Sequence, residues 1–148
     1  MTIIGVRTVA IALTLVGCLA TGPAIADPTG LWLDKDGDTL RIQPCGAALC
    51  GTIVNLKVAL DPKTGRPRTD EKNADAGRRN QPLVGVQSLI SMRPAGPGKW
   101  SGTLYNPDDG KTYSGNLLEL GQGKIRVEGC VLGLCGGESL NRVGSASL

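Results

Sequence analysis

Turn-forming residues interrupt this sequence about every eight to twelve positions, and this spacing constrains the fold more than any other feature. The segments between the turns are short and rich in β-branched and apolar residues, which favour strands. The predicted strands are "GLWLD" (30–34), "TLRIQP" (39–44), "GTIVNLKV" (51–58), "LVGVQSLISMR" (83–93), "WSGTLY" (100–105), "KTYSGNLLEL" (111–120), "KIRVEGC" (124–130) and "ESLNRV" (138–143).

Nearly all of these segments are joined by short loops, and consecutive strands with tight turns form an antiparallel meander. About eight twisted strands can close into an up-and-down barrel, which removes exposed strand edges. The pattern shows no amphipathic helix of useful length. The sequence therefore predicts a single all-β domain over residues 27–148, either an up-and-down β-barrel or a strongly curled sheet. Such a barrel is filled by side chains or holds one small ligand.

Residues 1–26 have the pattern of a signal peptide. Arg7 precedes an apolar run from Val9 to Gly17, and Ala24-Ile25-Ala26 forms a small-residue cleavage motif. The predicted location is therefore the periplasm or the secreted fraction. An alternative is that Leu15–Cys18 is a lipobox, in which case the protein would be a lipoprotein anchored through Cys18.

Four cysteines fall in the predicted domain, as two pairs with identical spacing: Cys45 with Cys50, and Cys130 with Cys135. A zinc site and a redox centre are the alternatives to structural disulfides. An exported protein rarely keeps four free thiols, and no C-x-x-C motif opens a helix. We predict disulfides 45–50 and 130–135, each directly across a four-residue hairpin loop, with cross-links between the two hairpins as the alternative. No metal and no cofactor are predicted.

The chain contains no histidine, which excludes Ser-His-Asp, Cys-His and HExxH catalysis. Its net charge of +3 falls to +2 without Arg7, too little to indicate nucleic-acid binding. The acidic groups Asp34–Asp38 and Asp108–Asp109 fit turns better than a calcium loop or a catalytic pair, because the EF-hand spacing fails. The chain is predicted not to be an enzyme, and no transmembrane segment is expected.

Residues 59–82 break the strand pattern with a long polar segment that contains three prolines. Loops of this length are usually functional or disordered. The segment is therefore either an ordered excursion across one mouth of the barrel or a mobile loop. The four aromatic residues either line a small cavity or fill the core. Strand alternation places Trp100, Gly102 and Leu104 on one face and Tyr105 on the other.

Several segments together resemble the bacterial DUF2147 family of exported proteins. They are "GLWL" (30–33), "RIQPCGAALCGTIVNLK" (41–57), "DPKTGRPRTDEKN" (61–73), "QPLVG" (81–85), "WSGTLYNPDDGKTY" (100–113) and the ending at 127–143. The resemblance implies a lipocalin-like, calycin-type barrel and no particular reaction. Two positions depart from the family pattern, because Asn55 and the segment Glu138–Arg142 stand where the family usually has tryptophan.

The candidate ligand-binding residues are Trp32, Asp70, Asn73, Arg79, Trp100, Tyr105, Tyr113 and Arg142. Arg79 and Arg142 are predicted to anchor an anionic group, with Asp70 and Asn73 ordering the loop. The leading hypothesis is a non-enzymatic module that binds a small apolar or amphipathic ligand, or an envelope partner, at a mouth covered by 59–82. The alternative is a structural or envelope-interaction protein whose barrel is filled and holds no ligand.

Overall fold

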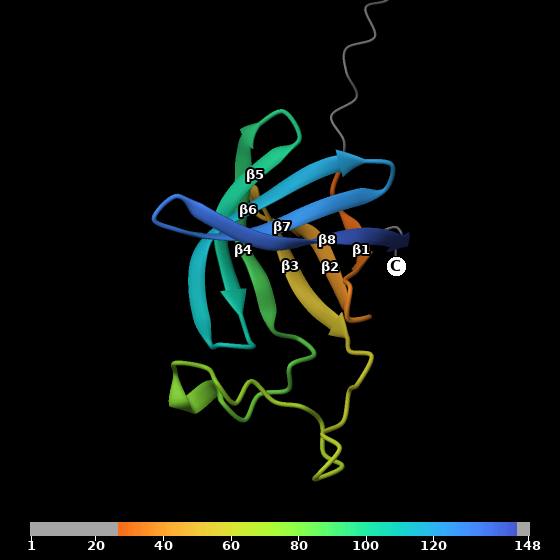
Figure 1. Ribbon diagram of the computed structural model, residues 1–148, viewed down its shortest axis with the longest axis vertical. Coiled ribbons are helices and arrows are strands. Elements are labelled where there is room, and N and C mark those ends of the chain that lie inside the picture. Colours follow the sequence, from red (N-terminus) through yellow and green to blue (C-terminus); the bar gives the residue numbers. More distant parts are fainter. Residues whose placement is uncertain (1–26, 145–148) are drawn as a thin grey trace, which may run out of the picture.

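The computed structural model describes residues 27–144 and shows eight antiparallel strands closed into a barrel (Figure 1). The strands are β1 (Gly30–Leu33), β2 (Thr39–Cys45), β3 (Ala48–Asn55), β4 (Gln87–Gly96), β5 (Lys99–Asn106), β6 (Lys111–Gly121), β7 (Lys124–Val131) and β8 (Leu134–Gly144). Each strand pairs with its neighbours in sequence, and β8 returns to β1. The all-β up-and-down barrel is confirmed. The predicted signal peptide and the lipobox at Cys18 lie outside the described residues.

Three strands begin three or four residues away from their predicted first residue. β3 begins at Ala48 rather than Gly51, and β8 begins at Leu134 rather than Glu138, because both hairpins close through turns of two residues. A positive φ makes this possible at Gly46 (68°) and Gly133 (81°), since glycine has no Cβ to clash. β4 begins only at Gln87, so the segment without strand structure runs from 56 to 86.

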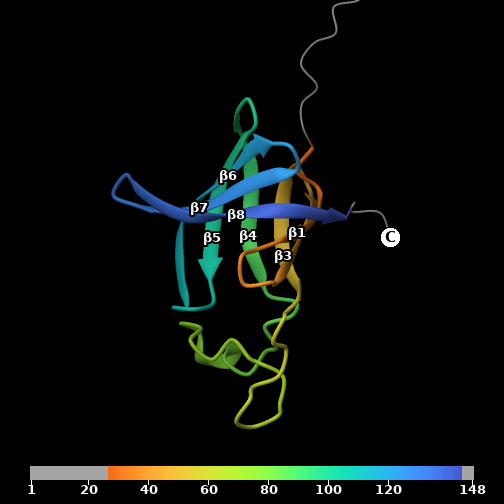
Figure 2. The ribbon, with the colours of Figure 1, turned by 45° about the vertical axis from the view of Figure 1, so that its right-hand side comes forward.

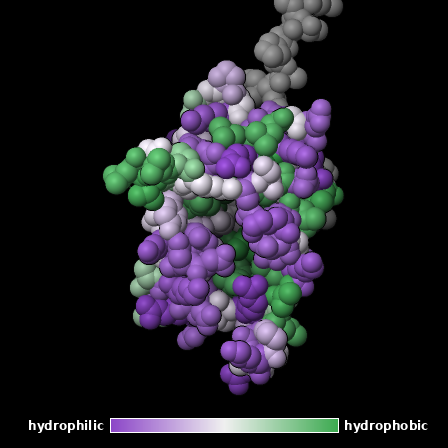
Figure 3. Space-filling model, viewed as in Figure 1, coloured by the Kyte–Doolittle hydropathy of each residue, from purple (hydrophilic) through white to green (hydrophobic). Residues whose placement is uncertain are grey.

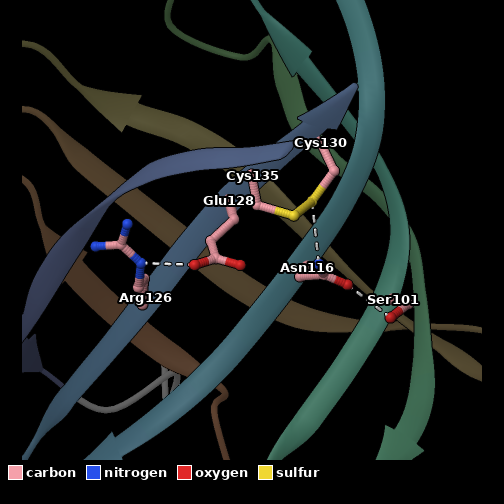
Figure 4. The surroundings of a disulfide bond; sticks show 6 residues. All are labelled: Ser101, Asn116, Arg126, Glu128, Cys130 and Cys135. Carbon is pink, nitrogen blue, oxygen red and sulfur yellow. Dashed lines mark hydrogen bonds and ion pairs between the residues drawn. A yellow bond between two sulfur atoms is a disulfide. The ribbon is translucent and has the colours of Figure 1, made fainter. Parts of the chain in front are cut away.

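The cysteines form the two predicted disulfides, Cys45–Cys50 and Cys130–Cys135. Cys130 and Cys135 are direct cross-strand partners with Cα atoms 4.1 Å apart, as predicted. The prediction that Cys45 and Cys50 face each other was wrong. Cys45 pairs with Ala48, so its disulfide runs diagonally across the hairpin between Cα atoms 5.7 Å apart. Figure 4 shows the second disulfide, where the Asn116 side chain donates a hydrogen bond to the Cys130 sulfur.

The barrel interior is filled by one main hydrophobic core. Its buried members are Trp32, Ile42, Leu89, Met92, Trp100, Leu117, Ile125, Val127 and Leu140, with Leu40, Leu49 and Leu104 packed against them. Both tryptophans therefore belong to the core. Strand alternation holds on β5, since Trp100 and Leu104 join this core while Tyr105 does not.

The barrel closes through a short seam between the first and last strands. β1 has four residues, and it pairs with β8 only at Asn141, Arg142 and Gly144. The earlier part of β8, residues 134–140, pairs with β7 alone. Figures 1 and 2 both show the β7–β8 hairpin projecting sideways beyond the other strands.

The segment 56–86 lies at the barrel end where β3 stops and β4 begins, below the strands in Figure 1. It is ordered by two isolated bridges, Leu60 with Pro67 and Thr69 with Pro82, and by the 3₁₀ helix Ala76–Arg78. A second apolar cluster of Leu56, Leu83, Val86 and Tyr105 attaches it to the barrel. Over residues 27–144, no helix has the length and apolar character needed to cross a membrane.

Candidate functional site

A cavity of about 390 Å³ opens at the barrel end next to the segment 56–86. Leu40, Leu104, Val127 and Leu140 line it, and these residues belong to the main core or pack against it. Ile53, Leu56 and Leu83 extend the apolar wall toward the segment 56–86. The floor of the cavity is therefore formed by the core residues nearest to this end of the barrel. In Figure 3 a hollow with hydrophobic residues inside and hydrophilic residues around it is visible on this face.

Charged side chains surround the entrance of this mouth cavity. Five are acidic (Asp34, Asp36, Asp38, Asp108 and Glu138) and two are basic (Lys35 and Arg68). The acidic residues come mainly from the β1–β2 turn, where the Asp34 carboxylate accepts hydrogen bonds from the backbone N–H groups of Asp36 and Asp38. The tight turn thus explains why carboxylates gather here. The rim has an acidic excess of three groups, in contrast to the net positive chain.

Glu138 is a half-buried rim carboxylate, and its Oε2 atom is shielded from solvent. Burial raises its pKa above the usual value, with Asp34 and Asp36 adding repulsion and Lys35 opposing the shift. The Lys35 ammonium group lies 3.5 Å from one carboxylate oxygen and also contacts Asp36. Oxygens of Asp34, Asp36 and Glu138 lie within 4.8 Å of one another, and the lysine contacts two of these three residues. This group therefore works as an ion-pair cluster with surplus negative charge.

A buried hydrogen-bond network holds the segment 56–86 against the barrel. Asp70 is fully buried, and its carboxylate accepts hydrogen bonds from the Tyr105 hydroxyl (2.6 Å), the Asn73 amide (2.7 Å) and the Gln81 amide (3.0 Å). Arg79 donates to the backbone carbonyl of Asn73 at 2.8 Å. Asp70, Asn73 and Arg79 therefore order the segment itself.

The segment 56–86 also touches the β5–β6 turn. Lys72 donates to the backbone carbonyl of Asp108 at 2.6 Å. At Gly110, where φ is +71°, a Cβ atom would lie 1.7 Å from the carbonyl oxygen of Lys72. Only glycine permits this close approach of two backbones. The predicted ordered excursion is therefore present, and it forms one wall beside the mouth through Arg68 and Leu83.

The remaining candidate residues lie elsewhere in the barrel. Trp32 is buried, donates to the carbonyl of Pro28 at 2.8 Å, and is covered by the Arg142 guanidinium at 4.3 Å from its ring centroid. Arg142 donates to the carbonyls of Asp27 and Thr29. Trp100 lies in the core, toward the opposite barrel end. Tyr113 donates to Asp109 in the β5–β6 turn.

The structure thus divides the eight predicted ligand-binding residues into separate groups. Of them, only Tyr105 lines the mouth cavity. Neither Arg79 nor Arg142 lines it, and the donors of both are directed at backbone carbonyls, so their positions do not favour anionic anchors. Lys35, Arg68 and Glu138 were not among the predicted ligand-binding residues. The acidic run Asp34–Asp38 was a visible signal, but its partner Glu138 follows a hundred residues later and only barrel closure brings the two together.

A comparison with known protein families assigns this chain to one of them. Residues 30–142 match the family described as "Uncharacterized protein conserved in bacteria (DUF2147)". The chain belongs to the DUF2147 family. No curated protein matches the sequence. The family resemblance seen in the sequence is confirmed, and this DUF2147 chain carries its mouth cavity entirely within the matched residues.

A solved structure has a similar fold. It is the Helicobacter pylori protein HP1028, described as belonging to the lipocalin family. The similarity has a TM-score of 0.66 at 17% sequence identity, and it covers 79% of this chain and 83% of HP1028. At this identity the comparison establishes a lipocalin-like fold for the DUF2147 chain and leaves its ligand open.

The Tyr105 hydroxyl gives the fold a predicted response to alkaline pH. Burial, together with the Asp70 carboxylate, raises the pKa of Tyr105 from 10.0 to about 12. The folded state requires the neutral phenol, so its contribution to stability is full below pH 10 and is lost as the pH rises to about 12. We expect urea midpoints to fall over this window in the wild type.

The matched variants for this test are Tyr105→Phe and Tyr113→Phe. Tyr105→Phe should be less stable at pH 8, and its decline between pH 10 and pH 12 should be shallower than that of the wild type. Tyr113 also has a raised pKa, through its hydrogen bond to Asp109, but it lies nearer the surface. Its variant should follow the wild-type curve, and identical slopes for all three proteins would refute a role for Tyr105.

Proposed function

We propose that this protein is a binding module whose mouth cavity holds a small amphipathic molecule with a cationic head. The observation that carries the proposal is the cavity itself, in which a floor of core residues is surrounded by a rim of acidic side chains. The apolar part of the ligand would lie against Leu40, Leu104 and Leu140. The head group would remain at the entrance, near Asp34 and Glu138.

The size and lining of the cavity support this ligand class. A volume of about 390 Å³ falls at the lower end of the range typical of small-molecule sites. Such sites combine apolar walls with a few polar groups that fix orientation. Five acidic groups against two basic ones favour a positive head group, because like charges at a partly desolvated rim would repel an anion.

The proposed location is outside the cytoplasm. Two disulfides are typical of oxidising compartments, and the pattern of residues 1–26 is that of a signal peptide. Periplasmic or secreted release is the preferred route, with attachment through Cys18 as the alternative. Binding is preferred over catalysis because the absence of histidine removes the commonest acid–base group, and the fold is lipocalin-like.

Isothermal titration with two simple probes tests the proposal. We expect decyltrimethylammonium to bind the purified domain with one site and decyl sulfate to bind at least tenfold more weakly. Glu138→Gln should weaken binding of the cationic probe by about threefold. The substitution removes the attraction between the carboxylate and the probe's ammonium group, and this attraction is partly screened because the Glu138 side chain is partly exposed. The Glu138→Gln variant should remain folded. The raised pKa of Glu138 shows that the folded state disfavours its charged form, so removing the charge does not destabilise the protein.

The matched control is Glu119→Gln, which removes a carboxylate at the opposite end of the barrel. This variant should bind the cationic probe like the wild type. Equal affinity for both probes, or equal weakening by the two substitutions, would contradict binding at the acidic mouth. A Leu104→Arg variant, which fills the cavity floor, should abolish binding of either probe.

The filled interior favours a second candidate function. The main core occupies the barrel beyond the mouth, with Trp32 and Trp100 among its members. A structural or envelope-interaction role without a ligand would fit such a barrel. Native mass spectrometry of protein purified from its own cell envelope separates the two functions. A stoichiometric mass increment that Leu104→Arg removes supports binding, while a bare mass supports the second candidate.

A further inference from the structure

The first part of β8 has a free edge in the described structure. β8 spans eleven residues, but the seam to β1 uses only Asn141, Arg142 and Gly144. Residues 134–140 have β7 on one side and no strand of residues 27–144 on the other. Free edges are normally blunted by proline, lysine or a covering segment. This one contains neither proline nor lysine, and all its residues except Glu138 and Leu140 are exposed.

The register identifies the backbone groups that face outward from this edge. Cys130 and Cys135 are paired with Cα atoms only 4.1 Å apart, the spacing of a non-hydrogen-bonded pair. The β7–β8 pairing continues without a register shift, so the alternation extends along the strand. Residues 135, 137 and 139 therefore direct their N–H and C=O groups away from β7, toward the free edge.

The surroundings of the edge are suited to a polypeptide. Gly136 and Gly137 carry no side chain that would shield the backbone, and Gly136 has open space where a Cβ atom would lie. The inward-facing residues Gly136, Glu138 and Leu140 line the mouth cavity. At the tip of the same hairpin, Leu132 and Leu134 are 98% and 81% exposed, and Figure 3 shows this hydrophobic projection.

We propose that an extended segment of another polypeptide docks on β8 as an added antiparallel strand. Its backbone would hydrogen-bond to residues 135, 137 and 139. Alternate side chains would point into the mouth cavity or out to solvent. Antiparallel pairing is chosen because every strand pair of the barrel is antiparallel. This is the β-augmentation mode of peptide recognition, in which the main chain supplies affinity and alternate pockets supply specificity.

Charge selects the kind of segment. The edge runs beside the acidic rim, including Asp34, Asp36 and Glu138, so a segment with apolar inward residues and a net positive charge is complementary. Its basic side chains would point outward and would be attracted to the rim over several ångströms rather than by direct ion pairs. A second copy of this chain is a poorer occupant. Pairing two β8 edges would bring two such rims together and place two Glu138 side chains on the same face. The site lies outside the small-molecule proposal, although a docked strand would cover the entrance of the same cavity.

The test uses a fluorescein-labelled heptapeptide of alternating lysine and valine, with binding measured by fluorescence anisotropy on the folded domain. In the antiparallel arrangement with valines pointing inward, the lysine N–H groups face β8 and the valine N–H groups face solvent. N-methylation of the internal lysines should therefore abolish binding. N-methylation of the same number of valines is the matched control and should preserve it. Equal effects of the two modifications would overturn the proposal.

A substitution in the protein provides the second arm. Ser139→Pro removes one outward N–H group while leaving the bonds to β7, and proline is tolerated at such edge positions. It should weaken peptide binding by about tenfold. Ser139→Ala keeps the N–H group and should bind like the wild type. Decyltrimethylammonium binding should be unchanged in both variants, which separates this proposal from the small-molecule one.

Three results would overturn the docking site. The first is unchanged peptide binding by a Ser139→Pro variant that retains the wild-type thermal unfolding curve. The second is the absence of peptide binding to the wild type at millimolar concentration. The third is a dimer in size-exclusion chromatography that Ser139→Pro converts to monomer, because a second copy would then occupy the edge.

Discussion

The Trp32→Ala variant is expected to lose about 3–5 kcal/mol of unfolding free energy, the range for removing a large buried aromatic side chain. Trp32 is 1% exposed and lies in the main core. Its loss also leaves the carbonyl of Pro28 without its indole donor and removes the ring beneath Arg142. Since β1 is only four residues long, this one side chain provides much of the packing at the seam.

Urea denaturation followed by circular dichroism measures the effect. Trp32→Phe keeps most of the volume and should recover more than half of the loss, while Leu120→Ala removes an exposed side chain and should change stability by less than about 0.5 kcal/mol. A loss below about 2 kcal/mol for Trp32→Ala would contradict the seam role of this residue.

Asp70→Ala is expected to cost about 3 kcal/mol, because three donors lose their acceptor in a buried site. The carboxylate joins Tyr105 on β5 to Asn73 and Gln81 in the segment 56–86. The damage should therefore be concentrated in that segment. Hydrogen exchange followed by mass spectrometry should show faster exchange in peptides from 59–82, with smaller changes in β6 and β7.

The matched control for this variant is Asp75→Ala. Asp75 accepts a hydrogen bond from the backbone of Gly77 at the start of the 3₁₀ helix, but its side chain is exposed. Its loss should cost less than about 1 kcal/mol and leave exchange in 59–82 nearly unchanged. If both variants behave alike, the segment is held by its apolar cluster rather than by Asp70.

The barrel could be predicted from the sequence because its signals are local. Turn residues such as Asp36-Gly37 and Gly98 lie between short apolar segments, and each pair of neighbours in sequence is also a pair in the sheet. The hairpin disulfides were predictable for the same reason. The two-residue turns were missed because the prediction assigned all four residues between each pair of cysteines to a loop, although the apolar Val131 and Leu134 pair with each other as strand residues.

The candidate site depends on contacts between distant parts of the chain, and these are harder to predict. Glu138 becomes a rim residue only when β8 returns beside the β1–β2 turn. The same closure gives Arg142 a role in packing on Trp32, which its charge alone does not indicate. Asp70 was predicted to order the loop, but its hydrogen bond from the Tyr105 hydroxyl joins residues far apart in the sequence and could not be predicted from their spacing.

The seam also has a consequence for the order of folding events. Leu31 pairs with Gly144, 113 residues later, whereas the other strand pairs join neighbours in sequence. Local hairpins can form early, but closing so long a loop carries the largest entropic cost and depends on the last strand. The slowest step of refolding should therefore be the one that buries Trp32. Until then the chain is an open sheet with two free edges, the species most exposed to aggregation and to capture by a chaperone.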